Sequence, residues 1–193
     1  MLKVAEAGLF SADLARGINL FIGAGFSILA RNSFRQTLPI GNELKTLLVK
    51  EFGLESYASL DLPSLYAILL SGRRDALRDY LEKVFTVREY DIRYDALRSL
   101  SVEFLYTTNI DDLPFHIFDA RSGDNTRVVH DLTLYGAPRQ ASEVVQFIPL
   151  HGNVRHEDAD FLFTPGQISS AFASDRQTWY VFQRELHSRP RFL

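Results

Sequence analysis

The stretch Ile18-Asn19-Leu20-Phe21-Ile22, followed directly by Gly23-Ala24-Gly25, decides the fold class of this chain. A short apolar run that is closed by glycines is typical of a buried strand that ends in a tight turn. Phe26, Ser27 and Ile28 come next, and we expect them to begin a helix. The pattern predicts a strand–turn–helix unit of the kind that begins a layered α/β domain.

Two further apolar runs end in polar or glycine-containing segments. One is Val102 to Tyr106, which leads into Thr107-Thr108-Asn109-Ile110-Asp111-Asp112, and the other is Gln146 to Leu150, which leads into His151-Gly152-Asn153. Weaker strands are predicted at 127–129 and 161–164. Because helices are expected between these strands, the sequence predicts an α/β fold with a mainly parallel sheet.

The interval between the first two strong strands has the spacing of helices. Apolar residues fall on one helical face over 42–53, Pro63 suits a first helical turn, and the clearest amphipathic stripe covers 77–85. The helical pattern continues over 90–100. We therefore predict a helical insertion over about 42–100, and a last helix that carries Phe172, Trp179, Phe182 and Leu186.

Composition limits the class of protein. The 193 residues suit one domain, and 46% apolar with 23% charged residues exclude disorder as an overall description. A net charge of -3 argues against direct nucleic-acid binding. No run approaches the roughly 20 apolar residues that a membrane span needs, and the N-terminus lacks the apolar core of a signal peptide. The absence of cysteine excludes disulfides, a thiol nucleophile and cysteine zinc sites. A cytoplasmic protein is expected.

The three strongest strands predict one site. In a parallel sheet, the loops at 23–25, 107–111 and 151–152 would emerge on the same edge, where ligands bind in such folds. Each loop also has a structural alternative. The glycines can cradle a phosphate or only form a tight turn, and Asn109 and Asp111 can bind a ribose hydroxyl and an amide or only cap a helix.

A histidine at the end of a strand is well placed as a general base near neutral pH, and His151 has this position. The alternative is a structural histidine. The other histidines have no spacing typical of metal ligands, and we assign no role to His116, His130, His156 and His187.

Taken together, Gly-Ala-Gly-x-Ser at 23–27, Thr-Asn-Ile-Asp at 108–111 and His-Gly at 151–152 resemble the sirtuin superfamily. The similarity is greatest to the SIR2-like domains of bacterial anti-phage defence proteins, which also have a segment similar to Leu38-Pro39-Ile40-Gly41-Asn42-Glu43-Leu44. The resemblance extends over about 20–192 and consists of separate short segments. It implies that 1–193 form a Rossmann-like NAD-binding domain with helices on both faces of the sheet and an inserted helical module.

The resemblance also implies residue roles. His151 would be the catalytic histidine, and Asn109 would position the attacking water and the ribose. Asp111 would hold the nicotinamide, whereas the glycine loop would line the NAD phosphates and ribose. The residues expected to bind NAD are Gly23, Ala24, Gly25, Ser27, Asn109 and Asp111.

The chain departs from the deacylases of this superfamily. The region 153–160, after His-Gly, has none of the four cysteines of their zinc module, so no metal is expected. Thr108 stands where deacylases usually have Gln, and their Gly-Ile-Pro-Asp-Phe-Arg stretch is not reproduced. The family's later Gly-x-Ser loop would follow Leu193, which predicts a domain truncated at its C-terminus.

The resemblance therefore implies an NAD+ glycohydrolase that releases nicotinamide and ADP-ribose and depletes NAD+ in anti-phage defence. Other readings remain open: a non-catalytic sensor of NAD or ADP-ribose, an assembly domain, or a deacylase or ADP-ribosyltransferase. The expected partners are NAD+ as substrate, a C-terminal sensor or ATPase region or partner protein, and further copies of the chain in a homo-oligomer.

Overall fold

A four-stranded parallel sheet forms the centre of the protein. The computed structural model describes residues 17–119, 128–135, 143–157, 161–173 and 177–188. The strand order is β1-β4-β6-β5, and all neighbouring pairs are parallel. These strands are β1 (Ile18–Ile22), β4 (Val102–Thr107), β6 (Val144–Pro149) and β5 (Val128–Asp131). The predicted α/β fold with a mainly parallel sheet is confirmed.

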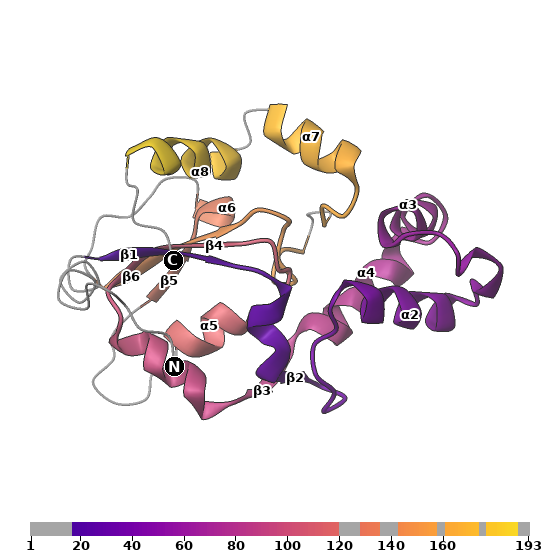
Figure 1. The fold of residues 1–193 in the computed structure, drawn as a ribbon, viewed down its shortest axis with the longest axis horizontal. Coiled ribbons are helices and arrows are strands. Elements are labelled where there is room, and N and C mark those ends of the chain that lie inside the picture. Colours follow the sequence, from indigo (N-terminus) through magenta and orange to yellow (C-terminus); the bar gives the residue numbers. More distant parts are fainter. Residues whose placement is uncertain (1–16, 120–127, 136–142, 158–160, 174–176, 189–193) are drawn as a thin grey trace, which may run out of the picture.

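Helices cover both faces of this sheet (Figure 1). The helix α5 (Leu113–Phe118) lies on one face, and α6 (Leu132–Tyr135), α7 (Pro165–Ala173) and α8 (Gln177–Ser188) lie on the other. Because successive side chains of a strand point to opposite faces, Leu105 packs into the core on the α5 side. Its neighbours Phe104 and Tyr106 pack with Trp179 of α8. The two inner strands, β4 and β6, therefore contribute to two cores.

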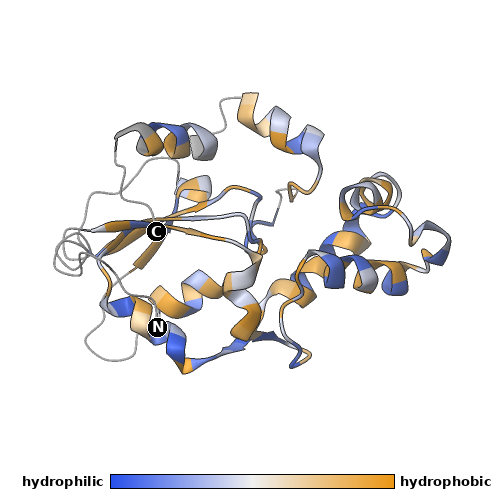
Figure 2. Ribbon diagram, viewed as in Figure 1, coloured by the Kyte–Doolittle hydropathy of each residue, from blue (hydrophilic) through white to orange (hydrophobic). Residues whose placement is uncertain are grey.

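Three helices project to one side of the sheet: α2 (Gly41–Phe52), α3 (Leu62–Gly72) and α4 (Arg74–Phe85) (Figure 1). The short 3₁₀-helix η2 (Glu55–Tyr57) connects α2 to α3. Gly53 ends α2 with φ +64°, a conformation that glycine adopts without strain. Asp61 begins α3 by accepting a hydrogen bond from the backbone N–H of Ser64. Most charged residues of α2 and α4 are exposed, and Figure 2 shows hydrophilic and hydrophobic residues alternating along these helices.

The predicted helical pattern over 42–100 is interrupted by a strand after Phe85. The chain then forms β3 (Val87–Tyr90), which pairs antiparallel with β2 (Ala30–Asn32). The 3₁₀-helix η3 (Ile92–Ser99) follows. Both strands are short and their pairing partners lie far apart in the sequence, so no periodicity of two was visible locally.

The helix predicted after the glycine loop is present as the six-residue 3₁₀-helix η1 (Ala24–Leu29), which ends where β2 begins at Ala30. Two other local predictions were wrong. Residues 161–164 form no strand, although Phe161 and Leu162 are buried. The single last helix is two helices, α7 and α8. The sequence also predicts the start of a further strand at 189–193, which lies outside the described residues.

Candidate functional site

The three loops that the sequence singled out do meet at one edge of the sheet. Ile22 pairs with Thr107, and Thr107 pairs with Pro149, so β1, β4 and β6 end at the same level. Backbone hydrogen bonds continue past these ends, from Thr108 N to Ile22 O (3.3 Å) and from Leu150 N to Thr107 O (2.8 Å). The register of the sheet therefore fixes where the polar residues after each strand begin.

Asn109 connects the second loop to the first. Its side-chain Nδ2 donates to Gly23 O and to Ser27 Oγ, at 3.0 Å each. Its own backbone N–H donates to Thr107 Oγ1 at 2.9 Å. Both Nδ2 hydrogens are thus used within the protein, whereas Oδ1 forms no hydrogen bond with the part of the chain that the structure describes. The carbonyl end of this carboxamide is the end available to a ligand.

Asp111 is a buried carboxyl group in the same cluster. Ser27 Oγ donates to Asp111 Oδ2 at 2.7 Å, and the backbone N–H of Leu113 donates to Oδ1 at 3.1 Å. Burial raises the pKa of Asp111 to about 6, while the hydrogen bonds from Ser27 and Leu113 lower it and the charge of Asp112 raises it. The carboxylate is therefore mostly ionised at pH 7 but close to titration.

The third loop carries His151 and joins the cluster through Asn153. The side chain of Asn153 is fully buried, and its Nδ2 donates to Asp111 O at 2.7 Å. Gly152, between His151 and Asn153, has φ +92°, a conformation that residues with a Cβ rarely adopt. Half-buried His151 has a pKa lowered from 6.5 by burial, so its imidazole is neutral at pH 7.

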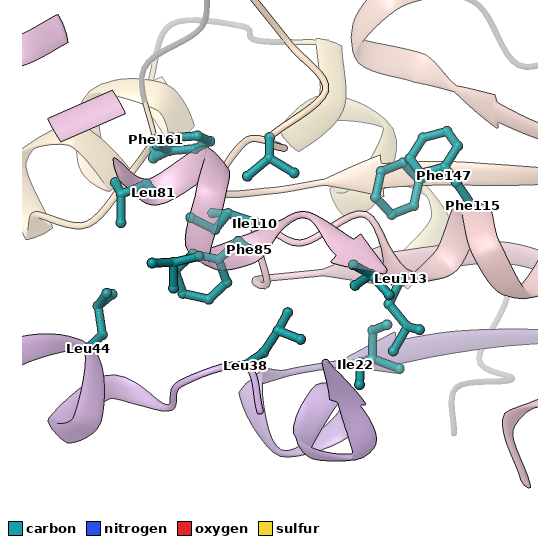
Figure 3. Packing of buried hydrophobic residues seen from close by; sticks show 14 of the residues in the cluster. Ile22, Leu38, Leu44, Leu81, Phe85, Ile110, Leu113, Phe115, Phe147 and Phe161 are labelled. Carbon is teal, nitrogen blue, oxygen red and sulfur yellow. The ribbon is translucent and has the colours of Figure 1, made fainter. Parts of the chain in front are cut away.

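A cavity of about 130 Å³ lies beside this cluster. Its polar wall includes Ser27, Asn109 and Asp111, and its apolar wall comes from the segment before α2 and from the helices that follow. Figure 3 shows Leu38 and Phe85 of that wall near Ile110, with Leu44 further to one side. The remaining lining residues are Ala24, Pro39, Gly41, Leu62, Thr108 and Phe163.

The size and lining of this cavity limit what it holds. Sites for drug-sized ligands measure roughly 300–1,000 Å³, so this cavity accommodates one ring-sized group and not a whole dinucleotide. An apolar wall opposite an amide and a carboxylate suits a flat ring with a polar substituent. His151 is not among the residues that line it. The structure thus brings Ala24, Ser27, Asn109 and Asp111 together, and it places His151 on the adjacent loop.

The glycines at 23 and 25 are not required by the folded backbone. Gly23 has an extended conformation, with φ -133°, and a Cβ there would meet Thr108 Oγ1 at 3.7 Å, an ordinary contact. A Cβ at Gly25 would meet nothing within 4 Å. A tight turn does form here, because Phe26 N donates to Gly23 O at 2.8 Å, but neither glycine is sterically required for it. Bare backbone next to the cavity is instead suited to the close approach of a ligand.

Sequence reasoning missed three features around the site. Asn153 was not singled out, although an amide side chain directly after His-Gly was a signal that could have identified it. Tyr94 was read as part of a helical stripe, and its hydroxyl contacts η1. His156 was given no role, yet its Nε2 lies 2.7 Å from Asp131 Oδ2 with both side chains buried. No sequence spacing predicts that last pair.

Neither metal sites nor membrane spans are found in the described part of the chain. No group of three or more His, Asp or Glu residues there could hold a metal ion, and no helix there is long and apolar enough to cross a bilayer. Comparison of the sequence with protein-family models gives no match, and comparison with curated proteins gives none either.

Proposed function

We propose that this protein is an NAD+ glycohydrolase that cleaves the nicotinamide–ribose bond. The observation that carries the proposal is the hydrogen-bonded cluster of Asn109, Ser27 and Asp111. It spans two loops, contacts the backbone of the glycine turn at Gly23, and lines a ring-sized cavity with an apolar opposite wall. A carboxamide-bearing ring matches this cavity, and a phosphate next to the bare glycine backbone matches the turn.

The chemistry needs few catalytic groups. The C–N bond to nicotinamide breaks with its electron pair leaving on the ring nitrogen, which neutralises the pyridinium charge, so no general acid is required. The ribosyl centre becomes oxocarbenium-like, as in glycoside hydrolysis. A water oxygen then bonds to that carbon, and the water proton leaves to a base. Products are nicotinamide, ADP-ribose and one proton.

The residues of this chain suit those steps. Asn109 Oδ1 would accept a hydrogen bond from a ribose hydroxyl or from the attacking water, because its Nδ2 is already held by Gly23 and Ser27. Asp111 would accept a hydrogen bond from the nicotinamide amide. His151, neutral at pH 7, would take the proton from the water or from a ribose hydroxyl.

The resemblance to SIR2-like defence domains extends the proposal to the cell. It implies a cytoplasmic protein that depletes NAD+ during phage infection, acts as a homo-oligomer, and is controlled by a C-terminal sensor or ATPase region or by a partner protein. Deacylation is disfavoured, because the cysteines of the deacylase zinc module are absent from the sequence.

The second candidate is a non-catalytic sensor that binds NAD+ or ADP-ribose at the same loops. One observation favours it: His151, the proposed base, does not line the cavity that Asn109 and Asp111 line. A sensor would need the binding residues and no base.

The test measures binding and chemistry on the same preparation of the full-length protein. Titration calorimetry with NAD+ reports binding, and chromatography of the same mixture reports nicotinamide release. Binding with release supports the hydrolase, and binding without release supports the sensor. Absence of binding to NAD+ and to ADP-ribose would refute both and leave the assembly role.

A further inference from the structure

The side chain of Tyr94, on η3, contacts the helix η1. Its hydroxyl donates a hydrogen bond to Phe26 O and accepts one from the backbone N–H of Leu29, at 3.4 Å. The side chain is only 7% exposed. One oxygen therefore holds two backbone groups of η1 that lie on either side of Ser27.

The position of Tyr94 is itself fixed by its surroundings. Its ring packs against Phe26 with centroids 5.2 Å apart and against Tyr90 at 6.3 Å. The backbone adds two hydrogen bonds, from Tyr94 N to Asp91 O (3.0 Å) and from Asp91 N to Leu29 O (3.2 Å). The start of η3 and the end of η1 are thus joined by main chain and side chain together.

The helix η1 needs such support. It has six residues in a 3₁₀ conformation, whose hydrogen-bond geometry is poorer than that of an α-helix and which rarely extends beyond three or four residues. Its N-cap, Gly23, provides no side-chain hydrogen bond. Yet Ser27 within it must keep its hydroxyl in reach of both Asn109 and Asp111. The helix by itself is a weak platform for that geometry.

We propose that Tyr94 is a positioning residue, whose hydroxyl holds η1 so that Ser27 Oγ stays within hydrogen-bond distance of Asn109 Nδ2 and Asp111 Oδ2. The placement of Ser27 follows from contacts within the protein. Its effect on the rate of NAD+ cleavage rests on the proposed function. Tyr94 is not among the residues that line the cavity, and its hydroxyl hydrogen bonds go to the backbone of η1.

The charged groups around Tyr94 leave its hydrogen bonds to η1 intact at neutral pH. Burial raises the pKa of Tyr94, the charges of Asp111 and Asp91 raise it further, and the charge of Arg93 lowers it. The hydroxyl is therefore protonated and able to donate. Near Asp111, which accepts from Ser27, the charge of Asp112 raises the pKa of the Asp111 carboxyl group.

The variant Tyr94→Phe removes the hydroxyl and keeps the ring. Its matched control is Tyr90→Phe, because the Tyr90 hydroxyl interacts with Asp95, His116 and Arg98 and makes no contact with η1. Two measurements need no NAD+. Hydrogen exchange at the Leu29 amide should become about fivefold faster or more in Tyr94→Phe, as expected for the loss of one hydrogen bond.

The second measurement is the titration of the Asp111 carboxyl carbon by NMR. The Ser27 hydrogen bond lowers the pKa of Asp111, so loosening that bond in Tyr94→Phe should raise this pKa by about half a unit to one unit. In a Ser27→Ala background the same substitution should cause no further rise, because the bond is already absent. If Tyr94 were only structural, Tyr94→Phe would change the pKa of Asp111 by the same amount in the parent and in the Ser27→Ala background.

The rate gives the third measurement. We expect kcat for nicotinamide release to fall about tenfold in Tyr94→Phe and to stay unchanged in Tyr90→Phe. Unchanged exchange at Leu29 and an unchanged Asp111 titration in folded Tyr94→Phe would overturn the proposal. If the parent protein releases no nicotinamide, the proposed function fails, and the first two measurements still decide the role of Tyr94.

Discussion

Ser27 Oγ lies 2.7 Å from Asp111 Oδ2, although the two residues are 84 positions apart in the chain. Ser27 donates to the carboxylate and accepts from Asn109 Nδ2 at the same time. The hydroxyl is thus the link between an amide whose carbonyl is available and a buried carboxylate whose charge it stabilises. The arrangement fixes the polar wall of the cavity before any ligand binds, which is the preorganisation that binding and catalysis benefit from.

Replacement of Ser27 by Ala should raise the pKa of Asp111 above about 6, because the variant loses a hydrogen bond that lowers this pKa. It should also reduce the free energy of unfolding by about 1–3 kcal/mol, since a buried acceptor loses its partner. Carboxyl NMR and denaturant unfolding measure the two effects. Ser71→Ala is the control, because exposed Ser71 bonds only within its own helix. Equal effects at both positions would contradict the prediction.

The stability of the protein should depend on the ionisation of Asp111. Its pKa is about 6 when folded and 3.8 in the reference state, so the folded chain binds the proton more tightly. The stabilisation relative to Asp111→Asn is then greatest below pH 3.8 and is lost as the pH rises through about 6, by up to roughly 3 kcal/mol. Unfolding of both proteins between pH 4 and pH 8 measures the difference. A difference that does not vary with pH would refute the buried-carboxylate assignment.

Removal of the proposed catalytic groups should slow NAD+ cleavage without unfolding the protein. We expect His151→Ala and Asn109→Ala each to lower kcat by about 10²–10⁴, the usual effect of losing a positioned base or water-orienting group. Asn42→Ala, at an exposed position of α2, is the control. Nicotinamide release and thermal unfolding are the measurements. Parental rates in both variants would show that the mechanism is wrong.

The pH dependence of kcat provides a separate check on the same groups. His151 has a pKa lowered from 6.5, and Asp111 has a pKa of about 6. Both act in their deprotonated forms in the proposed mechanism, so activity should be level above pH 7 and fall as the pH drops below about 6. In Asp111→Asn the pH dependence of the residual kcat should follow the titration of His151 alone. A kcat that increases as the pH falls would exclude the proposed roles of both His151 and Asp111.

A methyl group at position 23 should separate a ligand loop from a simple turn. The folded chain has room for a Cβ at Gly23, whose backbone is extended, so Gly23→Ala should leave the melting temperature unchanged. If a phosphate approaches this backbone, the same change should weaken NAD+ binding about tenfold or more. Gly166→Ala, where a Cβ meets nothing within 4 Å, is the control. Unaltered affinity would mean that the turn has no role in binding.

The buried pair of Asp131 and His156 should matter more for stability than an exposed ion pair. Asp131 also accepts from the backbone N–H of Thr133, and the carbonyl of His156 accepts from Arg78. Asp131→Ala leaves His156 Nε2 buried without its partner, so unfolding should become easier by about 1–3 kcal/mol. Glu82→Ala, which breaks a half-exposed i,i+4 pair, should cost below about 0.5 kcal/mol. Equal losses in denaturant unfolding would contradict burial as the cause.

The sequence by itself determined the parallel sheet and the elements that are strongly periodic. The apolar run at 18–22 and the amphipathic stripe over 77–85 became β1 and α4, because burial of a continuous apolar surface needs no distant partner to be recognised. It also identified the three loops that meet, since parallel strands place their carboxyl ends on one edge. Asn109, Ser27 and Asp111 were therefore predictable as neighbours.

Only the tertiary structure decided the features that depend on contacts between distant segments. β2 and β3 exist because each pairs with the other, and Asp131 and His156 form a pair because the end of β5 meets a loop after β6 in the interior. The support of η1 by Tyr94 and the closure of the cavity by Leu44 and Phe85 are of the same kind. Local sequence patterns carry no information about such contacts, because a hydrogen bond or an apolar wall between remote residues leaves no periodicity in the chain.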